Sequence, residues 1–364
     1  MIYLDHHAAT PVSPEVRAAM DAARDRAWAN ASSAHRFGRE ARALLEDARA
    51  AVAEAIGAEP ASVVFTSTGT EACHVGLAGF RGLRRVVMSP LEHPAVAENC
   101  AALGLPVHRF EMTGGRPPPA EALGLREGDL LAVTWVNHET GTILPVEDYC
   151  RAAREAGASS FVDGIQALGK VPVNVRALGA DAVAFAAQKV GGPTGAAALF
   201  VRRGAPHDSP LLGGPQERGR RPGTPDVERF VGFGAAAKAI PGRLAAMPRV
   251  AALRDRLEAG LLALGAEVNG REGPRAATVT DVSFRGRRGP VLVAALDLAG
   301  VACSHGSACS SGLDEPSKVL LGLYPDDPER ARSALRLSLG PETTGDDVDR
   351  ALAAIAKVIG AAKP

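Results

Sequence analysis

The chain has 364 residues, of which 46% are hydrophobic and 23% charged, a composition that predicts packed globular domains and excludes intrinsic disorder. Its 41 basic residues balance 41 acidic ones, so the net charge gives no reason to expect a nucleic-acid or membrane partner. Because no apolar run could span a bilayer, no signal-peptide pattern opens the chain and the five cysteines are scattered and odd in number, we expect a cytoplasmic protein without a disulfide framework.

Short apolar runs alternate with helical stretches through the first two thirds of the chain. A helix is expected from Pro14, with Ser13 as its N-cap, and a longer amphipathic one over residues 38–56, which Gly57 ends. This alternation predicts an α/β fold with a mostly parallel sheet and helices on both faces. Strands of that sheet are expected at 63–65, 85–88, 130–136, 161–163, 182–185 and 196–201.

The pattern changes after a helix expected over residues 227–240. Pro241 and Pro248 mark a candidate boundary, and beyond it the expected strands at 278–284 and 334–340 lie between helices. We therefore expect a large domain over residues 13–240 and a smaller α+β domain formed by residues 1–12 and 241–364.

Polar residues follow several strands, at the edge where open α/β sheets bind ligands. Residues 66–70 place small hydroxyl side chains and a glycine at the expected start of a helix. Such a turn can bind a phosphate group, although turns of this composition are common. Asp163 and Lys189 each follow an apolar run. A lysine that forms a Schiff base and an acid that keeps a pyridine nitrogen protonated would suit pyridoxal phosphate. Taken alone, a surface lysine and a helix-capping aspartate are the more frequent explanation.

Taken in order, the segments of this chain resemble those of the cysteine desulfurases, within the class V aminotransferase-like family of fold-type I pyridoxal phosphate enzymes. The resemblance covers essentially the entire chain and implies a seven-stranded large-domain sheet plus a smaller α+β domain. No single segment is specific, but their order is. The segments are YLDHHAATP, NASSAHRFGREAR, TSTGTEA, EHPAV, NHETGTILPV, FVDGIQALGKVPV, AAQKVGGPTGAAALFVRR, GGPQERGRRPGTP, GSACSSGLDEPS and LRLSLG.

The resemblance implies a role for each matching residue at a pyridoxal 5'-phosphate site. Lys189 would be the Schiff-base lysine and Asp163 the partner of the pyridine nitrogen. His93 would stack on the ring and also transfer a proton near the substrate thiol. The remaining cofactor contacts would come from Gln166 and His138 at the phenolic oxygen, from Gly69, Thr70 and Gln188 at the phosphate, and from Thr224 at the phosphate of a neighbouring subunit.

For the substrate, the resemblance implies that Arg336 pairs with the carboxylate, with Asn30 nearby, and that Cys309 is the nucleophile that accepts sulfur. Without the family match, an arginine in an apolar strand is usually an edge residue and a cysteine in a Ser/Gly loop is often merely tolerated. The other four cysteines are expected to be structural, including Cys303, although it is close enough in sequence to be a resolving thiol.

Four positions near the expected site depart from the family pattern. His138 replaces an asparagine, and Ala186 and Gln188 replace a serine and a histidine that help to hold the phosphate. His7 stands where a small or amide residue is common. Alanine cannot donate to a phosphate and glutamine can do so only in part, so weaker cofactor binding or another substrate or partner is expected.

The resemblance therefore implies a desulfurase that converts L-cysteine to L-alanine and passes sulfur, as a persulfide on Cys309, to an acceptor protein. The long cysteine loop is similar to that of the branch that serves iron–sulfur assembly or tRNA thiolation, and the shared sites imply a homodimer. Two alternatives stay open: a pyridoxal phosphate-dependent C–S lyase or related β-elimination enzyme, and a weakly catalytic scaffold that binds sulfur carriers.

Overall fold

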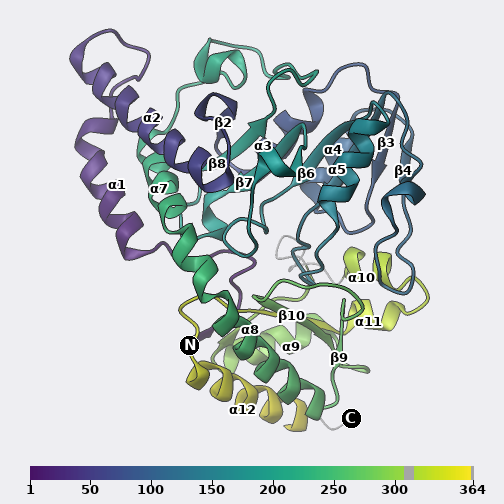
Figure 1. The fold of residues 1–364 in the computed structure, drawn as a ribbon. Helices are drawn as coiled ribbons and strands as arrows, with labels where there is room; N and C mark the ends of the chain where they lie inside the picture. Colours follow the sequence, from purple (N-terminus) through teal and green to yellow (C-terminus); the bar gives the residue numbers. More distant parts are fainter. Residues whose placement is uncertain (307–314, 362–364) are drawn as a thin grey trace.

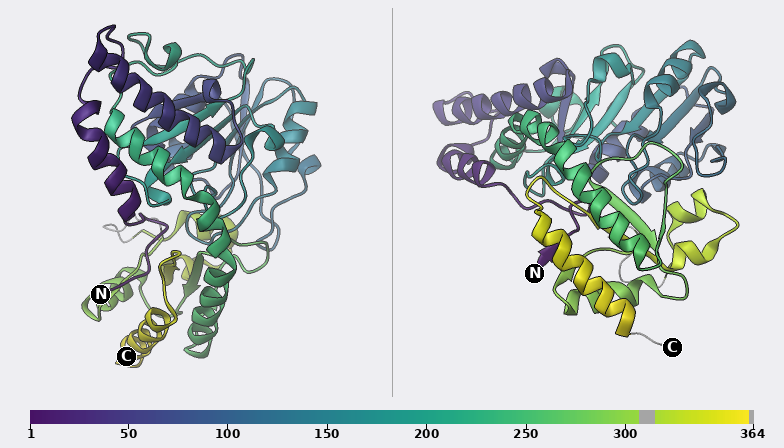
Figure 2. Two further views of the ribbon diagram at one scale, coloured as in Figure 1. Left: turned by 60° about the vertical axis from the view of Figure 1, so that its left-hand side comes forward. Right: turned by 60° about the horizontal axis from the view of Figure 1, so that its bottom comes forward.

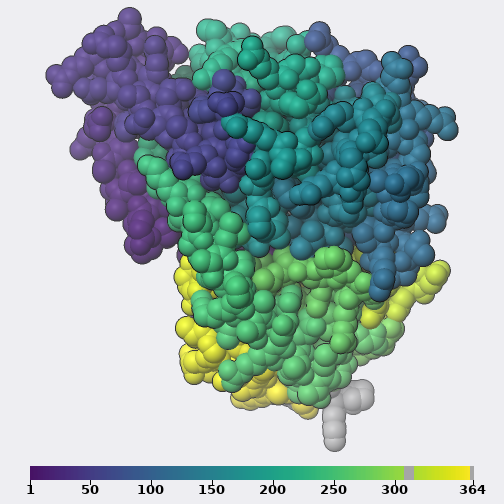
Figure 3. All heavy atoms as spheres, in the orientation of Figure 1, coloured from purple at the N-terminus to yellow at the C-terminus, as the bar shows by residue number. Residues whose placement is uncertain are grey.

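The computed structural model describes residues 1–306 and 315–361 of the chain. An upper unit built from the N-terminal two thirds sits on a smaller lower unit, and both chain ends lie at the lower unit (Figure 1). Two further directions show the long helix α8 (Ile240–Ala263) running from one unit into the other (Figure 2). The space-filling view shows the two units in contact across the width of the visible face (Figure 3).

The upper unit is organised by a seven-stranded sheet with the order β2-β8-β7-β6-β5-β3-β4. All its strands run parallel except β8, which is antiparallel to both neighbours. This confirms the expected mostly parallel α/β sheet. The strands are β2 (Val63–Thr66), β3 (Arg85–Met88), β4 (Val107–Arg109), β5 (Asp129–Thr134), β6 (Ser159–Asp163), β7 (Ala182–Ala186) and β8 (Ala197–Val201).

Helices cover both faces of this sheet because successive strand residues point to opposite sides. In β2, Phe65 joins one hydrophobic core and Val64 the other. The helices on the Phe65 side are α1 (Pro14–Ala27), α2 (Arg36–Ile56), α5 (Val146–Glu155), α6 (Val175–Leu178) and α7 (Val227–Lys238), and those on the Val64 side are α3 (Gly69–Ala78) and α4 (Pro94–Ala102).

The lower unit contains an antiparallel sheet of order β12-β10-β9 and a parallel pair, β1 with β11. Its core joins Ile2 and Leu4 to apolar residues from Met247 to Ile355. The expected domains, residues 13–240 and residues 1–12 with 241–364, would separate these elements in the same way, and this division remains a prediction. The elements are β1 (Ile2–Tyr3), β9 (Glu267–Val268), β10 (Val279–Ser283), α9 (Gly289–Leu298), β11 (Val301–Ala302), α10 (Lys318–Leu323), α11 (Pro328–Arg332), β12 (Ala334–Ser338) and α12 (Gly345–Ala361).

The helix α8 continues through the boundary that Pro241 and Pro248 were expected to mark. Pro241 lies in its first turn, where the missing N–H has no helical acceptor to lose. Pro248 lies inside the helix, so two prolines in this stretch do not produce a linker. Within residues 1–306 and 315–361, no helix is both long and apolar enough to cross a membrane. Short 3-10 turns occur at η1 (Pro60–Ser62), η2 (Ala120–Leu123), η3 (Ala187–Lys189) and η4 (Gln216–Gly219).

Candidate active site

A cavity of about 240 Å³ opens at the carboxyl ends of the parallel strands, the expected ligand-binding edge. Asp163 ends β6, Lys189 closes the turn after β7, and Thr134 ends β5. Arg336 from β12 brings the lower unit into the same cavity. The lining is completed by His7, Ala8, Thr68, Gly69, Thr70, His93, Ala95, Val136, His138, Ile165, Gln166 and Gln188.

Asp163 is buried at the end of β6, and its Oδ1 accepts a hydrogen bond from the Ile165 N–H at 3.0 Å. Burial raises the pKa of this carboxyl, although the Ile165 N–H and the nearby His138 and Lys189 oppose the rise. A buried carboxylate needs a cationic or hydrogen-bonding partner. A protonated pyridine nitrogen is such a partner, so Asp163 fits the ring nitrogen of pyridoxal phosphate.

The amine of Lys189 is held by the N-terminal segment of the chain. Its Nζ donates hydrogen bonds to the carbonyl oxygens of His7, at 2.7 Å, and Ala8, at 2.6 Å. These contacts keep the amine at the cavity, where a cofactor aldehyde would need it. The segment after β1 therefore positions the amine of Lys189, which lies in the turn after β7.

The first turn of α3 forms the part of the cavity best suited to an anion. Thr68 caps this helix by accepting a hydrogen bond from the Glu71 N–H at 3.0 Å. A Cβ at position 69 would lie 2.6 Å from Cδ1 of Ile165, so a larger residue would require the Ile165 side chain to shift. Free N–H groups at a helix start, beside the hydroxyls of Thr68 and Thr70, fit a phosphate group.

Two histidines face each other at the cavity, with ring centroids 5.1 Å apart. Nδ1 of His93 accepts a hydrogen bond from the Ala95 N–H at 3.0 Å, so the proton of the neutral ring is on Nε2. Burial lowers the pKa of His93 to about 3, with smaller effects from His138 and Lys189 in the same direction. Nε2 of His138 is buried without a hydrogen bond in the described part of the chain, although Glu139 Oε1 lies 3.4 Å away. The two side chains therefore lie in contact, and they form an ion pair only when the His138 ring is protonated.

Arg336 is 1% exposed and is oriented by two contacts. Its Nη2 donates to Asp5 Oδ1 at 2.7 Å and its Nη1 to the His138 carbonyl oxygen at 3.0 Å. Its Nε is buried and makes no hydrogen bond to a described residue. A guanidinium with an unused N–H at this cavity can bind a carboxylate.

The residues that differ from the family pattern also lie close to the cavity. Ala186 is fully buried at the end of β7, and Gln188 lines the cavity while its carbonyl oxygen accepts from Thr10 Oγ1 at 2.9 Å. His7 is fixed between the His138 carbonyl oxygen, to which Nδ1 donates at 3.2 Å, and Thr278 Oγ1, 2.9 Å from Nε2. Burial lowers the pKa of His7 well below the usual range, so its ring is neutral.

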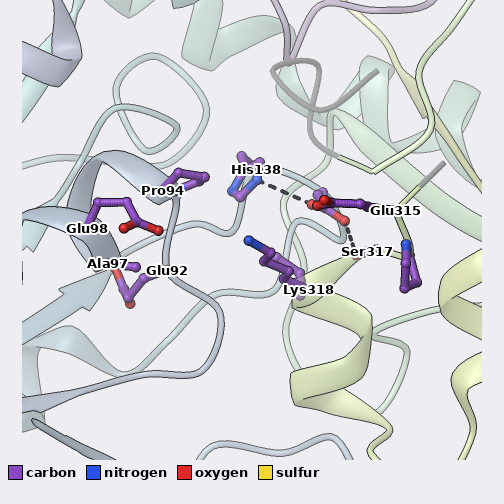
Figure 4. Close-up of a pocket in the computed structure, with 11 residues that line it drawn as sticks. Glu92, Pro94, Ala97, Glu98, His138, Glu315, Ser317 and Lys318 are labelled. Carbon is purple, nitrogen blue, oxygen red and sulfur yellow. Dashed lines mark hydrogen bonds and ion pairs between the residues drawn. The ribbon is translucent and has the colours of Figure 1, made fainter. Parts of the chain in front are cut away.

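A second cavity of about 240 Å³ shares His138 and lies between the start of α4 and the segment before α10. The carboxylate of Glu139 lies 3.4 Å from Nε2 of His138 and accepts a hydrogen bond from the Ser317 hydroxyl. Figure 4 shows this cavity with His138 and Ser317 labelled. Against the effect of burial, these two contacts and the nearby Arg336 lower the pKa of Glu139. Burial raises the pKa of the neighbouring Glu92 to about 8, although hydrogen bonds from Ser89 and the Thr134 N–H oppose the rise.

Two of the expected site residues are not at the cavity. Asn30 and Thr224 are exposed and do not line it, and the loop between α1 and α2 that carries Asn30 lies far from the lower unit that carries Arg336 (Figure 1). The structure thus does not bring Asn30 to Arg336 within one chain. Cys309 lies between Gly306 and Glu315, outside the described residues.

Sequence reasoning gave no role to three residues that organise the cavity. Asp5 pairs with Arg336, Lys170 hydrogen-bonds Gln166, and Ile165 packs against Gly69. Lys170 and Gln166 are four residues apart, a spacing that could have suggested the contact. Asp5 and Arg336 are 331 residues apart, so no local pattern could have joined them.

Comparisons with known proteins agree with this geometry. The model of the class-V aminotransferase family matches residues 2–351. The chain is 39% identical to an "IscS-like cysteine desulfurase" of Mycobacterium tuberculosis, over 100% of this chain and 97% of that protein. It is 38% identical to a "Cysteine desulfurase" of Cereibacter sphaeroides, over 98% of this chain and 95% of that protein.

Solved structures are similar over nearly the same extent. A structure titled "NIFS-LIKE PROTEIN" aligns with a TM-score of 0.91 and 30% identity, over 99% of this chain and 100% of its own. A structure titled "SspA in complex with cysteine" aligns with a TM-score of 0.81 and 26% identity, over 94% of this chain and 100% of its own.

Proposed function

This chain belongs to the class-V aminotransferase family, whose members depend on pyridoxal 5'-phosphate, and from that premise we propose that it is a cysteine desulfurase converting L-cysteine to L-alanine. One observation supports this most directly: Lys189, Asp163 and Arg336 share a single cavity. An amine, a ring-nitrogen partner and a carboxylate-binding guanidinium are what an amino-acid reaction of this cofactor needs.

We assign the cofactor contacts to residues that line the cavity. Asp163 would hold the ring nitrogen, and Gly69 and Thr70 at the start of α3 would hold the phosphate with part of Gln188. Gln166 and His138 would serve the phenolic oxygen, and His93 the ring face. When bound, the cofactor supplies an electron sink for the pair that remains after proton loss from the substrate Cα.

The protein's own groups then do four things. Arg336 binds the carboxylate of L-cysteine, and Lys189 provides the covalent attachment point and, once released, takes the Cα proton. His93 donates a hydrogen bond from Nε2 near the substrate sulfur, because its Nδ1 is occupied by the Ala95 N–H.

We propose that Cys309 receives the sulfur. Its thiolate forms a bond with the substrate sulfur while the carbon–sulfur bond breaks, and the electron pair of that bond stays with the three-carbon fragment, which takes up protons and leaves as L-alanine. Overall, L-cysteine and one thiol give L-alanine and one persulfide. An acceptor protein of iron–sulfur assembly or tRNA thiolation would then take this sulfur.

We further propose a homodimer and a cytoplasmic location. Thr224 and Asn30 are exposed outside the cavity of their own chain, so they can serve a site only in a second copy. The thiols of Cys73, Cys100, Cys150 and Cys303 are unpaired, which is usual in a reducing compartment.

The test measures alanine, sulfide and the absorbance of the purified protein before and after addition of L-cysteine. Wild type should show the visible band of the bound cofactor and release alanine, and Cys309→Ala should lose most turnover. The matched control is Cys303→Ala, because burial raises the pKa of Cys303 to about 12 and leaves it a poor nucleophile. Full turnover in Cys309→Ala would favour a C–S lyase, and absence of the cofactor band in wild type would favour a scaffold.

A further inference from the structure

Lys170 is a buried lysine that the proposed reaction does not use. It is 6% exposed, four residues after Gln166, in the turn that follows β6. Its Nζ donates a hydrogen bond to Gln166 Oε1 at 2.9 Å and lies 3.5 Å from the carbonyl oxygen of Lys189. Burying a lysine is costly, so a buried lysine beside a cofactor site calls for a functional explanation.

We propose that Lys170 is a positioning residue that acts through Gln166: by donating to Oε1 it holds the amide so that Nε2 presents an N–H to the phenolic oxygen of the cofactor. The proposal rests on the proposed function, since it presupposes bound pyridoxal 5'-phosphate.

The hydrogen bonds of Gln166 fix which end of its amide faces the cavity. Its Nε2 donates to the His7 carbonyl oxygen at 2.8 Å, and its Oε1 accepts from Lys170. A primary amide carries two N–H bonds, and only one of these two has an acceptor among the described residues. Gln166 lines the cavity together with Asp163 and His138, so the second N–H is available to a ligand there.

The opposite orientation of the amide is disfavoured at both ends. It would set the Gln166 carbonyl oxygen against the His7 carbonyl oxygen and would lose the hydrogen bond that Lys170 donates to Oε1. Without Lys170, however, Oε1 would be a buried acceptor without a partner, which favours any rotation that reaches another donor. Lys170 therefore stabilises the orientation in which the Gln166 amide N–H faces the cavity.

The same network reaches the amine of Lys189. The His7 carbonyl oxygen accepts from both Gln166 Nε2 and Lys189 Nζ. Hydrogen bonds in such a chain polarise one another in a low dielectric. A hydrogen bond donated to Gln166 Oε1 therefore strengthens the hydrogen bonds that Gln166 Nε2 donates.

The charged and titratable groups around Lys170 come from four segments of the chain. Burial lowers its pKa well below the usual range, and Lys189 and Arg243 act in the same direction. Glu342 lies 3.8 Å from Arg243, and His6 and His7 on the N-terminal segment are neutral because burial lowers their pKa values, that of His6 to about 4. A lysine in this setting acts mainly as an N–H donor, so its replacement does not remove an essential ion pair.

The test is a pH titration of the visible absorbance of the loaded protein without substrate. Lys170→Met keeps an unbranched side chain only one atom shorter and removes the donor. Loss of donation toward the phenolic oxygen makes protonation of the chromophore easier, so its midpoint should rise by about 0.5–1 pH unit. Lys238→Met on α7, an exposed lysine, is the matched control and should leave the midpoint unchanged.

A double-mutant cycle separates the proposed route from a general effect. In a Gln166→Leu background, Lys170→Met should cause no further shift, because the residue through which it acts is gone. Lys170→Gln, which retains an N–H donor one bond shorter, should recover part of the wild-type midpoint and serves in the same cycle if Lys170→Met does not fold.

An unchanged midpoint in Lys170→Met, an equal shift in both backgrounds, or no recovery in Lys170→Gln would each overturn the proposal. None of these outcomes concerns L-cysteine turnover. By contrast, wild-type protein without any visible band would overturn the proposed function itself, so the two failures are distinguishable.

Discussion

Among single side chains, those at the cavity are held by partners from distant parts of the chain. Lys189 is held by the carbonyl groups of His7 and Ala8, and Arg336 by Asp5. Several of the side chains that line the cavity were predictable, because their residue types and order match a family, and their chemical roles remain predictions. Their supports were not, because a carbonyl acceptor or an ion pair across the chain has no local pattern.

The buried carboxyl of Glu92 should make stability depend on pH. Its pKa is about 8 in the folded protein against an ordinary value of 4.5, because burial disfavours the ionised form. Its contribution to stability is therefore fully present below pH 4.5 and lost as pH rises through about 8. Glu92→Gln cannot ionise, so its free energy of unfolding, measured in urea, should fall less between these two pH values. Parallel losses in wild type and variant would contradict this assignment.

Ala186 and Gln188 should weaken retention of the cofactor during turnover. Each hydrogen bond lost to a charged group costs about 1.5–3 kcal/mol, and about 1.4 kcal/mol is a tenfold change in binding. The variant Ala186→Ser/Gln188→His should therefore bind the cofactor at least about tenfold more tightly than wild type when exposed to L-cysteine. Cofactor remaining after gel filtration measures this. Equal retention would mean that other residues, such as Thr68, already complete the phosphate site.

Among contacts that link helices and strands, a buried ion pair between Arg49 and Glu217 anchors the segment that carries Thr224. Glu217 receives Nη1 and Nη2 of Arg49, at 2.6 and 2.7 Å, and its Oε2 also accepts the Phe65 N–H at 2.8 Å. Glu217 and Arg218 have φ values of 49° and 57°, a region that non-glycine residues rarely adopt. The ion pair thus holds a strained turn of η4 against α2 and β2.

Glu217→Ala should destabilise the protein by about 3–5 kcal/mol, because it leaves the 2% exposed Arg49 side chain without a bidentate partner. Glu46→Ala is the matched control: Glu46 contacts the same arginine at 3.2 Å but is 45% exposed, so its loss should cost less than about 1 kcal/mol. Free energies of unfolding in urea compare the two. Similar losses would show that the Glu217 contact is no stronger than a surface pair.

Most strands were predictable within two residues at each end, for a physical reason. The apolar runs at 161–163 and 182–185 correspond to Ser159–Asp163 and Ala182–Ala186, because strands buried on both faces are apolar throughout. The strands β1, β9 and β11 have two residues each, too few for any periodicity. Arg49 and Glu217 are 168 residues apart and neither has a local signal for the contact.

For the complete assembly, we expect two chains that exchange parts of their sites. Thr224→Ala should weaken the site of the neighbouring chain, and Lys189→Ala should inactivate the site of its own chain. In a mixed dimer of the two variants, one site has both defects and the other has none. Each mixed dimer should therefore have about half of the activity of a wild-type dimer at limiting cofactor, and an equimolar mixture, in which about half of the dimers are mixed after random exchange, about a quarter.

The control mixes Lys189→Ala with Asp163→Ala, which place their defects in separate sites and should restore nothing. Light scattering before and after mixing gives the mass of the species. A monomer with full activity, or no restoration in the first mixture after proven subunit exchange, would contradict sites shared between chains.

The pairing of β1 has a consequence for biosynthesis. Ile2 and Tyr3 pair with Val301 and Ala302, and Asp5 bridges to Ser338. On the ribosome, the upper sheet with Asp163 and Lys189 is complete long before these partners are made. The carbonyl groups that hold the Lys189 amine belong to a segment that these late-made strands help to anchor. A chain released before β11 and β12 are made would therefore lack part of the support of this amine, and we expect it to retain the cofactor less well.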